Sequence, residues 1–170
     1  MSDATTVFAG IQIPSTDPVF LWIVAIHIPL GLICVVTGAV AMVSMKAPGR
    51  HPTLGRIYYW SIVAIFITAT ALSFMRWTHN RHLLVLGVLT LAAAHLGRTA
   101  ACRRWPGWIR VHIAGMGLSY VLLLTAFYVD NGKQLPLWRD LPVWTYWTLP
   151  MFVGAPIIIW AVSRHPLVLR

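Results

Sequence analysis

Five long apolar segments follow one another along the chain, separated by short stretches rich in arginine, proline and tryptophan. A helix needs about 20 mostly apolar residues to cross about 30 Å of hydrocarbon. The third segment is the shortest, and it reaches that length only when Arg98 and the small residues up to Cys102 are included. The predicted spans are residues 19–44, 57–75, 83–102, 109–129 and 143–163.

This pattern predicts an all-α fold, a polytopic integral membrane protein with a bundle of five transmembrane helices. The spans leave no room for a separate soluble domain, so residues 1–170 form a single transmembrane domain. Residues 1–18 contain no Lys or Arg and therefore lack the charged region of a cleavable signal peptide. We expect them to form a short translocated tail that leads into the first span.

The composition agrees with a membrane protein and excludes several other classes. Hydrophobic residues make up 58% of the chain and charged residues 10%, whereas a soluble domain carries about a quarter charged residues. The net charge is +9, and all four acidic residues are aspartates. Long apolar runs throughout the chain exclude disorder, a basic nucleic-acid-binding domain and a secreted disulfide scaffold. We expect no nucleic-acid partner.

The positions of Lys and Arg predict the orientation in the membrane, because short cytoplasmic loops carry an excess of both. With the N-terminus outside, nine of them fall on the cytoplasmic side and four outside, together with all four aspartates. A re-entrant third segment would destroy this separation. We expect a multi-pass cell-membrane protein with a cytoplasmic C-terminus. The cytoplasmic set is Lys46, Arg50, Arg56, Arg98, Arg103, Arg104, Arg110, Arg164 and Arg170, and the outer set is Arg76, Arg81, Lys133 and Arg139.

The basic loops have a general explanation in the bilayer itself. Arginines beside a span bind anionic lipid headgroups, at about 1 kcal/mol each. The expected partners are therefore the lipid bilayer and anionic headgroups at the cytoplasmic face. The sequence leaves open a membrane protein partner or a homo-oligomer.

Histidine is the main candidate for chemistry, because no carboxylate lies in a span or a cytoplasmic loop. Di-iron carboxylate sites and carboxylate proton relays are thereby excluded. His27 lies near the middle of the first span, whereas His51, His95 and His112 lie at the cytoplasmic ends of three others. A histidine in an apolar span is a functional candidate by default. The alternative is that each links two helices by a hydrogen bond.

Two cofactor types fit these residues, haem b or a divalent metal ion. Imidazole ligates haem iron, and one haem could span two non-adjacent helices. Three histidines, His51, His95 and His112, could instead hold a metal ion. His95 and His112 are expected on adjacent helices, which suits a direct hydrogen bond or a metal ion better than a porphyrin. Arg98, one helical turn after His95, is counted with the cofactor-binding candidates.

Three motifs resemble a family of bacterial predicted membrane proteins of unknown function, number 2306 in that series. They are HIPLG in the first span, HPTLGRIYYWS before the second, and HIAGMGLSYVLLLTAFYVDNG in the fourth. The shared pattern is a first-span histidine followed by His-x-x-x-Gly-Arg-x-Tyr, met here by His51, Gly55, Arg56 and Tyr58. The resemblance implies a multi-span fold in a bacterial inner membrane and points to His27, His51, Arg56 and His112. It supplies no activity.

Two functions follow from these residues. The first is a redox-associated membrane protein that binds one haem or metal through the cytoplasmic-side histidines. The second is a non-enzymatic membrane subunit or accessory protein with structural histidines. The sequence assigns no catalytic residue. A transporter is disfavoured, because the spans carry few polar residues and no carboxylate to couple ions.

Overall fold

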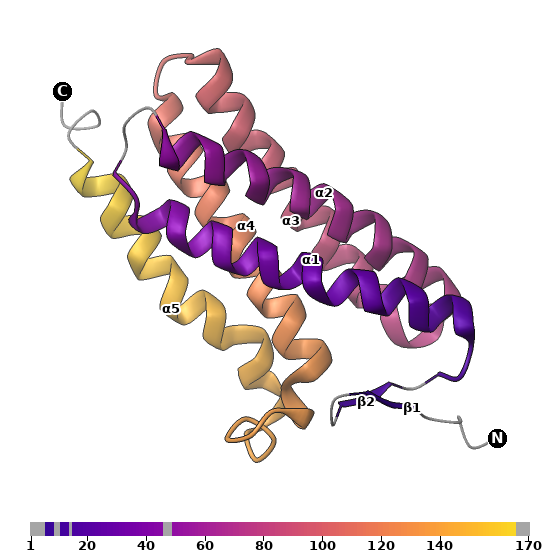
Figure 1. Ribbon diagram of the computed structural model, residues 1–170. Helices are drawn as coiled ribbons and strands as arrows, with labels where there is room; N and C mark the ends of the chain where they lie inside the picture. The colour runs from indigo at the N-terminus through magenta and orange to yellow at the C-terminus, as the bar shows by residue number, and fades with distance from the viewer. Residues whose placement is uncertain (1–5, 9–10, 14, 46–48, 166–170) are drawn as a thin grey trace.

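The computed structural model describes residues 6–8, 11–13, 15–45 and 49–165, and long helices make up most of this part of the chain (Figure 1). Five of these helices are long and apolar enough to cross a membrane, which confirms the predicted five-span, all-α fold. Each contains 22 to 27 residues. They are α1 (Pro18–Val43), α2 (Arg50–Met75), α3 (Trp77–Arg103), α4 (Trp108–Asn131) and α5 (Val143–Arg164).

A short hairpin precedes the first helix and was not predicted. Strand β1 (Thr6–Phe8) pairs antiparallel with β2 (Ile11–Ile13), and Thr6 lies opposite Ile13. Asp17 then caps α1, because its carboxylate accepts a hydrogen bond from the Val19 backbone N–H at 2.8 Å. A single 3-10 turn, η1 (Gly132–Gln134), follows α4.

The second and third helices are longer than their apolar segments. Helix α2 begins at Arg50 rather than residue 57, and α3 begins at Trp77 rather than residue 83. Hydropathy marks only the part of a helix that lies in hydrocarbon, whereas backbone hydrogen bonding continues through polar residues at the interface. The third segment is therefore a complete helix of 27 residues.

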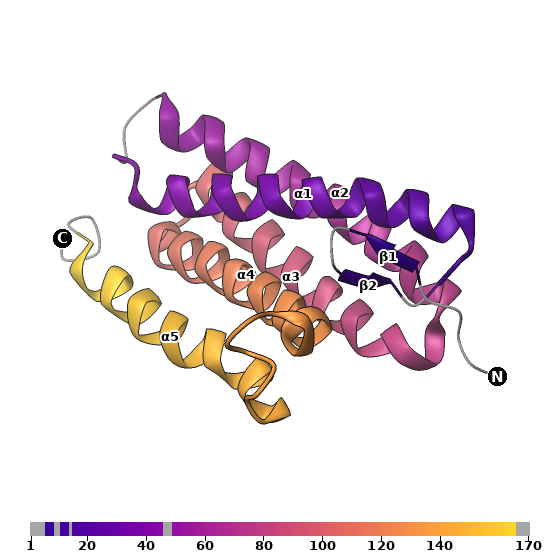
Figure 2. The same cartoon turned by 60° about the horizontal axis from the view of Figure 1, so that its bottom comes forward.

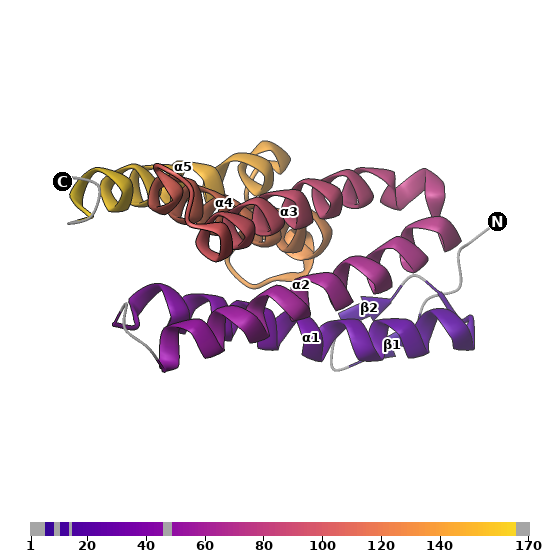
Figure 3. The same ribbon diagram turned by 90° about the horizontal axis from the view of Figure 1, so that it is seen from above.

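The helices form two layers. Helices α1 and α2 make one layer, and α3, α4 and α5 make the other (Figure 3). Each helix packs against the next one in the chain, and α5 lies beside α4 on the far side from α1 and α2 (Figure 2). The buried core lies between the layers and is formed by Cys34, Tyr58, Tyr59, Ile62 and Ala94.

Most other apolar side chains face outward. Trp22 and Phe152 are both 72% exposed, and exposed large apolar residues occur on all five helices. A water-soluble protein rarely exposes contiguous apolar surface on this scale. The outer surface is therefore one that faces lipid.

Small residues bring α3 and α4 into backbone contact. A Cβ atom on Gly115 would lie 2.8 Å from the Ala93 carbonyl oxygen and 2.8 Å from the Gly97 nitrogen. One on Gly97 would lie 2.9 Å from the Met116 nitrogen. Glycine is thus required at both positions, as is typical of close helix pairs in membranes.

The two ends of the bundle differ in charge. The C-terminal ends of α1, α3 and α5 and the N-terminal ends of α2 and α4 meet at one end, which we call the basic end (Figure 1). Lys46, Arg170 and Asp3 belong to the predicted charge pattern but lie outside the described residues. The described arginines in the basic half are Arg50, Arg56, Arg98, Arg103, Arg104, Arg110 and Arg164.

Candidate functional site

Two of the candidate histidines meet at the basic end. His51 lies in the first turn of α2 and His112 in the second turn of α4. Their ring centroids are 6.1 Å apart, and the ring planes are nearly perpendicular, at 85°. We refer to them as the His51–His112 pair. The fold thus brings together two residues that are 61 positions apart.

The pair belongs to a longer contact between α2 and α4, which run in the same direction. Two helical turns after the pair, the Tyr58 hydroxyl lies 2.9 Å from the Ser119 hydroxyl, and both side chains are buried. Tyr58 and Ser119 are also 61 positions apart. The same offset of 61 positions therefore aligns α2 with α4 at both contacts. Each of these helices nevertheless packs more extensively against its neighbours in the chain.

Backbone carbonyls hold both rings of the pair. The Nδ1–H of His51 donates to the Ala41 carbonyl oxygen at 2.9 Å, and that of His112 donates to the Gly97 carbonyl oxygen at 3.0 Å. A carbonyl oxygen can only accept, so in the neutral imidazole these bonds place the proton on Nδ1 and the lone pair on Nε2. Histidines that ligate metals are usually oriented by such a second hydrogen bond.

The spacing of the pair suits a metal between the rings. Two imidazoles on one metal ion, at about 2.0–2.1 Å each, place their ring centroids about 6 Å apart or less. Among the described residues, however, no group of three or more His, Cys, Asp or Glu side chains could hold a metal ion. The predicted set of His51, His95 and His112 is therefore not assembled there, and two imidazoles remain.

His95 makes contacts of its own on the outer surface. It is exposed on α3, and its Nδ1 lies 3.1 Å from the Tyr59 hydroxyl. The Arg98 guanidinium lies over the Tyr59 ring, 4.5 Å from the centroid, and 5.9 Å from the Trp60 ring centroid. His95 is thus bonded to α2, whereas His112 is bonded to α3.

His27 links α1 to α2 near the middle of the bundle. Its Nδ1 lies 2.7 Å from the Thr68 hydroxyl oxygen, and that hydroxyl donates to the Ala64 carbonyl oxygen. The Thr68 proton is thereby occupied, so the imidazole N–H is the donor. This contact satisfies a polar side chain in an apolar span.

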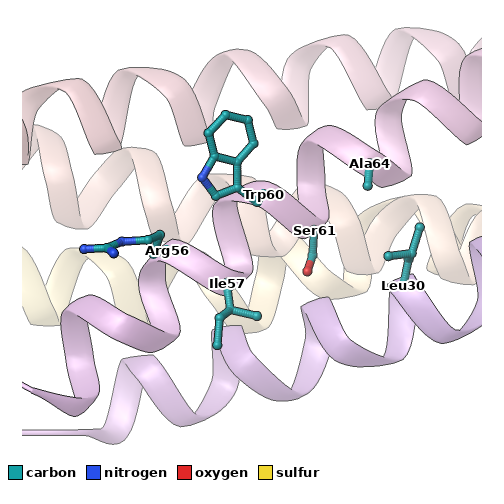
Figure 4. A pocket seen from close by; sticks show the side chains of 6 residues that line it. All are labelled: Leu30, Arg56, Ile57, Trp60, Ser61 and Ala64. Carbon is teal, nitrogen blue, oxygen red and sulfur yellow. The ribbon is translucent and has the colours of Figure 1, made fainter.

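Arg56, the last of the candidates, lies on the outside of α2. It is exposed and lines an open groove together with Trp60 and other residues of α2 and with Leu30 of α1 (Figure 4).

The main residues that the sequence analysis missed are the hydroxyl partners. Tyr58, Tyr59, Thr68 and Ser119 each complete an interhelical hydrogen bond. One signal was available in the sequence. His51 and Tyr58 are seven residues apart, and so are His112 and Ser119. Equal polar spacing on two parallel helices indicates a shared face.

These features define a multi-pass membrane protein with a helical bundle and an interhelical histidine pair at its basic end. Comparison of the chain with protein-family models, with curated proteins and with solved structures finds no match.

Proposed function

We propose that this membrane protein binds one metal centre, a haem iron or a transition-metal ion, between His51 and His112, and that it serves electron transfer. The observation that carries the proposal is the geometry of the pair. The two imidazole rings are in a T-shaped arrangement with centroids 6.1 Å apart, and each is oriented by a backbone carbonyl through Nδ1. Imidazole nitrogens ligate haem iron as well as iron, copper, nickel and zinc ions.

The core contact below the pair limits where a haem can lie. Tyr58 and Ser119 join α2 to α4 seven residues beyond the pair, which is about 10 Å along the helix axis. A macrocycle held by the pair would therefore occupy the basic end of the bundle and not its centre. His51 and His112 would supply two imidazole nitrogens and their orientation, and the bound iron would supply the redox change.

We propose further that the basic end faces the cytoplasm, with the C-terminus on that side. The proposal is supported by the described arginines of the basic end and by the three described aspartates, Asp17, Asp130 and Asp140, which lie toward the opposite end. Such an arrangement follows the excess of basic residues in cytoplasmic loops. We also propose kinship with family 2306, on the strength of His51, Gly55, Arg56 and Tyr58.

A second function is favoured by a separate observation. His27, His51, His95 and His112 each make a hydrogen bond to a different helix. Four such bonds would suffice to join the helices of a non-enzymatic membrane subunit. In that case the His51–His112 pair would be structural.

The test is an absorbance spectrum and an elemental analysis of protein purified in mild detergent. A Soret band identifies haem, and stoichiometric metal without that band identifies a bare ion. We expect His51→Ala and His112→Ala to lose the bound centre and His95→Ala, the matched control, to retain it. His112→Met keeps a ligand at the same position, so a shifted spectrum in that folded variant would assign the ligation directly. A colourless, metal-free wild-type protein would overturn the proposal in favour of structural histidines.

A further inference from the structure

An open groove lies on the lipid-facing side of α1 and α2, away from the core. It has a volume of about 400 Å³ and is lined by Leu30 of α1 and by Arg56, Ile57, Trp60, Ser61 and Ala64 of α2 (Figure 4). The α2 residues recur at intervals that place them along one side of the helix. Arg56 extends away from Leu30 and Ala64, toward the basic end (Figure 4).

The groups along this groove change character in a fixed order. Arg56 is exposed at the end nearest the basic end of the bundle, and Trp60 beside it is 56% exposed. Ser61 follows about 7.5 Å from Arg56 along the helix axis, and Ala64 follows about 12 Å from it. A permanent cation thus comes first, with Ile57 next to it. An indole and a hydroxyl follow, and the apolar Ala64 and Leu30 lie at the other end of the groove.

This order matches the order of groups in an anionic phospholipid that stands in one leaflet. A guanidinium binds a phosphate through paired hydrogen bonds. Indole rings favour the headgroup layer, where an apolar body meets a polar edge. A hydroxyl suits the ester oxygens of the glycerol backbone, and the apolar floor suits an acyl chain.

A second cation lies close to the same indole. The Arg98 guanidinium of α3 lies 5.9 Å from the Trp60 ring centroid, on the ring that also lines the groove. Arg98 does not itself line the groove, so Arg56 is the arginine placed to bind a headgroup there. The positive charge of these arginines favours a headgroup with net negative charge over a zwitterionic one.

We propose that the groove between α1 and α2 is a binding site for one anionic phospholipid, with its phosphate at Arg56 and an acyl chain along Ala64 and Leu30. The site is separate from the His51–His112 pair and does not rest on the proposed metal function. In this site Arg56 binds a specific ligand, a lipid phosphate, in place of a general role in membrane orientation.

The experiment measures which lipids the protein retains. The full chain is reconstituted in vesicles of equal parts phosphatidylglycerol and phosphatidylcholine with identical acyl chains, extracted in mild detergent and analysed by native mass spectrometry. We expect the wild type to retain phosphatidylglycerol over phosphatidylcholine by about fivefold. Arg56→Gln is expected to abolish this preference. The matched control Arg110→Gln removes an exposed arginine of the basic end that does not line the groove, and should leave the preference intact.

A second variant tests the acyl part of the site without a change of charge. Ala64→Trp fills the groove from a residue that lines it, and is expected to reduce retention of both lipids. Equal loss of the preference in Arg56→Gln and Arg110→Gln would overturn the proposal, because general attraction to the basic end would then explain the retention. Unchanged retention in Ala64→Trp would overturn it as well. Elution of each variant as a single species in gel filtration shows that it is folded.

Discussion

The imidazole rings of His51 and His112, from two helices that run in the same direction, make a T-shaped contact with centroids 6.1 Å apart. Each ring also makes a hydrogen bond to a further helix. The His51 ring donates to the Ala41 carbonyl oxygen of α1, and the His112 ring donates to the Gly97 carbonyl oxygen of α3. The pair therefore stands where four helices meet. The same register places Tyr58 against Ser119 farther into the core.

The first prediction concerns this deeper contact. Tyr58→Phe removes the hydroxyl and keeps the ring, so we expect the free energy of unfolding to fall by about 0.5–1.5 kcal/mol. The Ser119 hydroxyl keeps its bond to the Met116 carbonyl oxygen, which limits the loss. Unfolding by denaturant in detergent micelles measures the change. Tyr128→Phe is the control, because no hydrogen bond is found for the Tyr128 hydroxyl within the described part of the chain. An equal loss in both variants would contradict the assignment.

The second prediction concerns the backbone contact of α3 and α4. A methyl group at position 115 would meet the Ala93 carbonyl oxygen at 2.8 Å, so Gly115→Ala must separate the helices. We expect destabilisation of about 1–3 kcal/mol. Gly31→Ala is the matched control in α1, since an added Cβ there meets no atom within 4 Å among the described residues, apart from its chain neighbours and the local helix backbone. That variant should be neutral or slightly more stable, because alanine favours a helix. A thermal denaturation series compares the two.

The third prediction concerns the link between α1 and α2 at mid-depth. Thr68→Val keeps the shape of the side chain and removes the acceptor of the His27 N–H. The imidazole then loses a partner in an apolar span, and we expect a loss of about 1–2 kcal/mol. Thr148→Val is the control, because the exposed Thr148 hydroxyl bonds only to the Trp144 carbonyl oxygen of its own helix. If the double variant His27→Leu with Thr68→Val is as unstable as Thr68→Val alone, the unpaired imidazole is not the cause.

The fourth prediction tests the side of the membrane. Cys34 is fully buried and Cys102 is exposed at the basic end. A membrane-impermeant maleimide should therefore label Cys102 in inverted inner-membrane vesicles and leave it unlabelled in intact spheroplasts. Cys102→Ser should abolish the labelling in both preparations. Labelling of intact spheroplasts would reverse the proposed orientation.

Hydropathy predicted the five spans because a segment of about 20 apolar residues is stable in the hydrocarbon of a bilayer. It placed the ends of α1, α4 and α5 within about two residues, but began α2 and α3 too late. The first turns of those two helices are polar and lie outside hydrocarbon, so they leave no apolar signal. The hairpin β1–β2 was missed for a similar reason, since six paired residues carry too short a pattern.

The candidate site could be predicted only in part. His51 and His112 lie at the same end of the bundle, as expected, because the position of a residue along a helix determines how far along the bundle it lies. Which residues face one another depends on helix rotation and on which helices are neighbours. His95 is exposed on α3 and contacts the hydroxyl of the buried Tyr59 of α2, so it does not join the His51–His112 pair. The sequence therefore predicts how far along its helix each histidine lies, whereas the packing of the helices determines which histidines are in contact.

The bond from His51 to Ala41 has a consequence for the order of assembly during synthesis. It spans ten residues and needs only α1 and α2, whereas the partner His112 follows 61 residues after His51. At a synthesis rate of about 5–20 residues per second, His112 is added several seconds later. The structural requirements for orienting the first imidazole are therefore complete once α1 and α2 have been made, whereas the contact of the pair requires α4 as well.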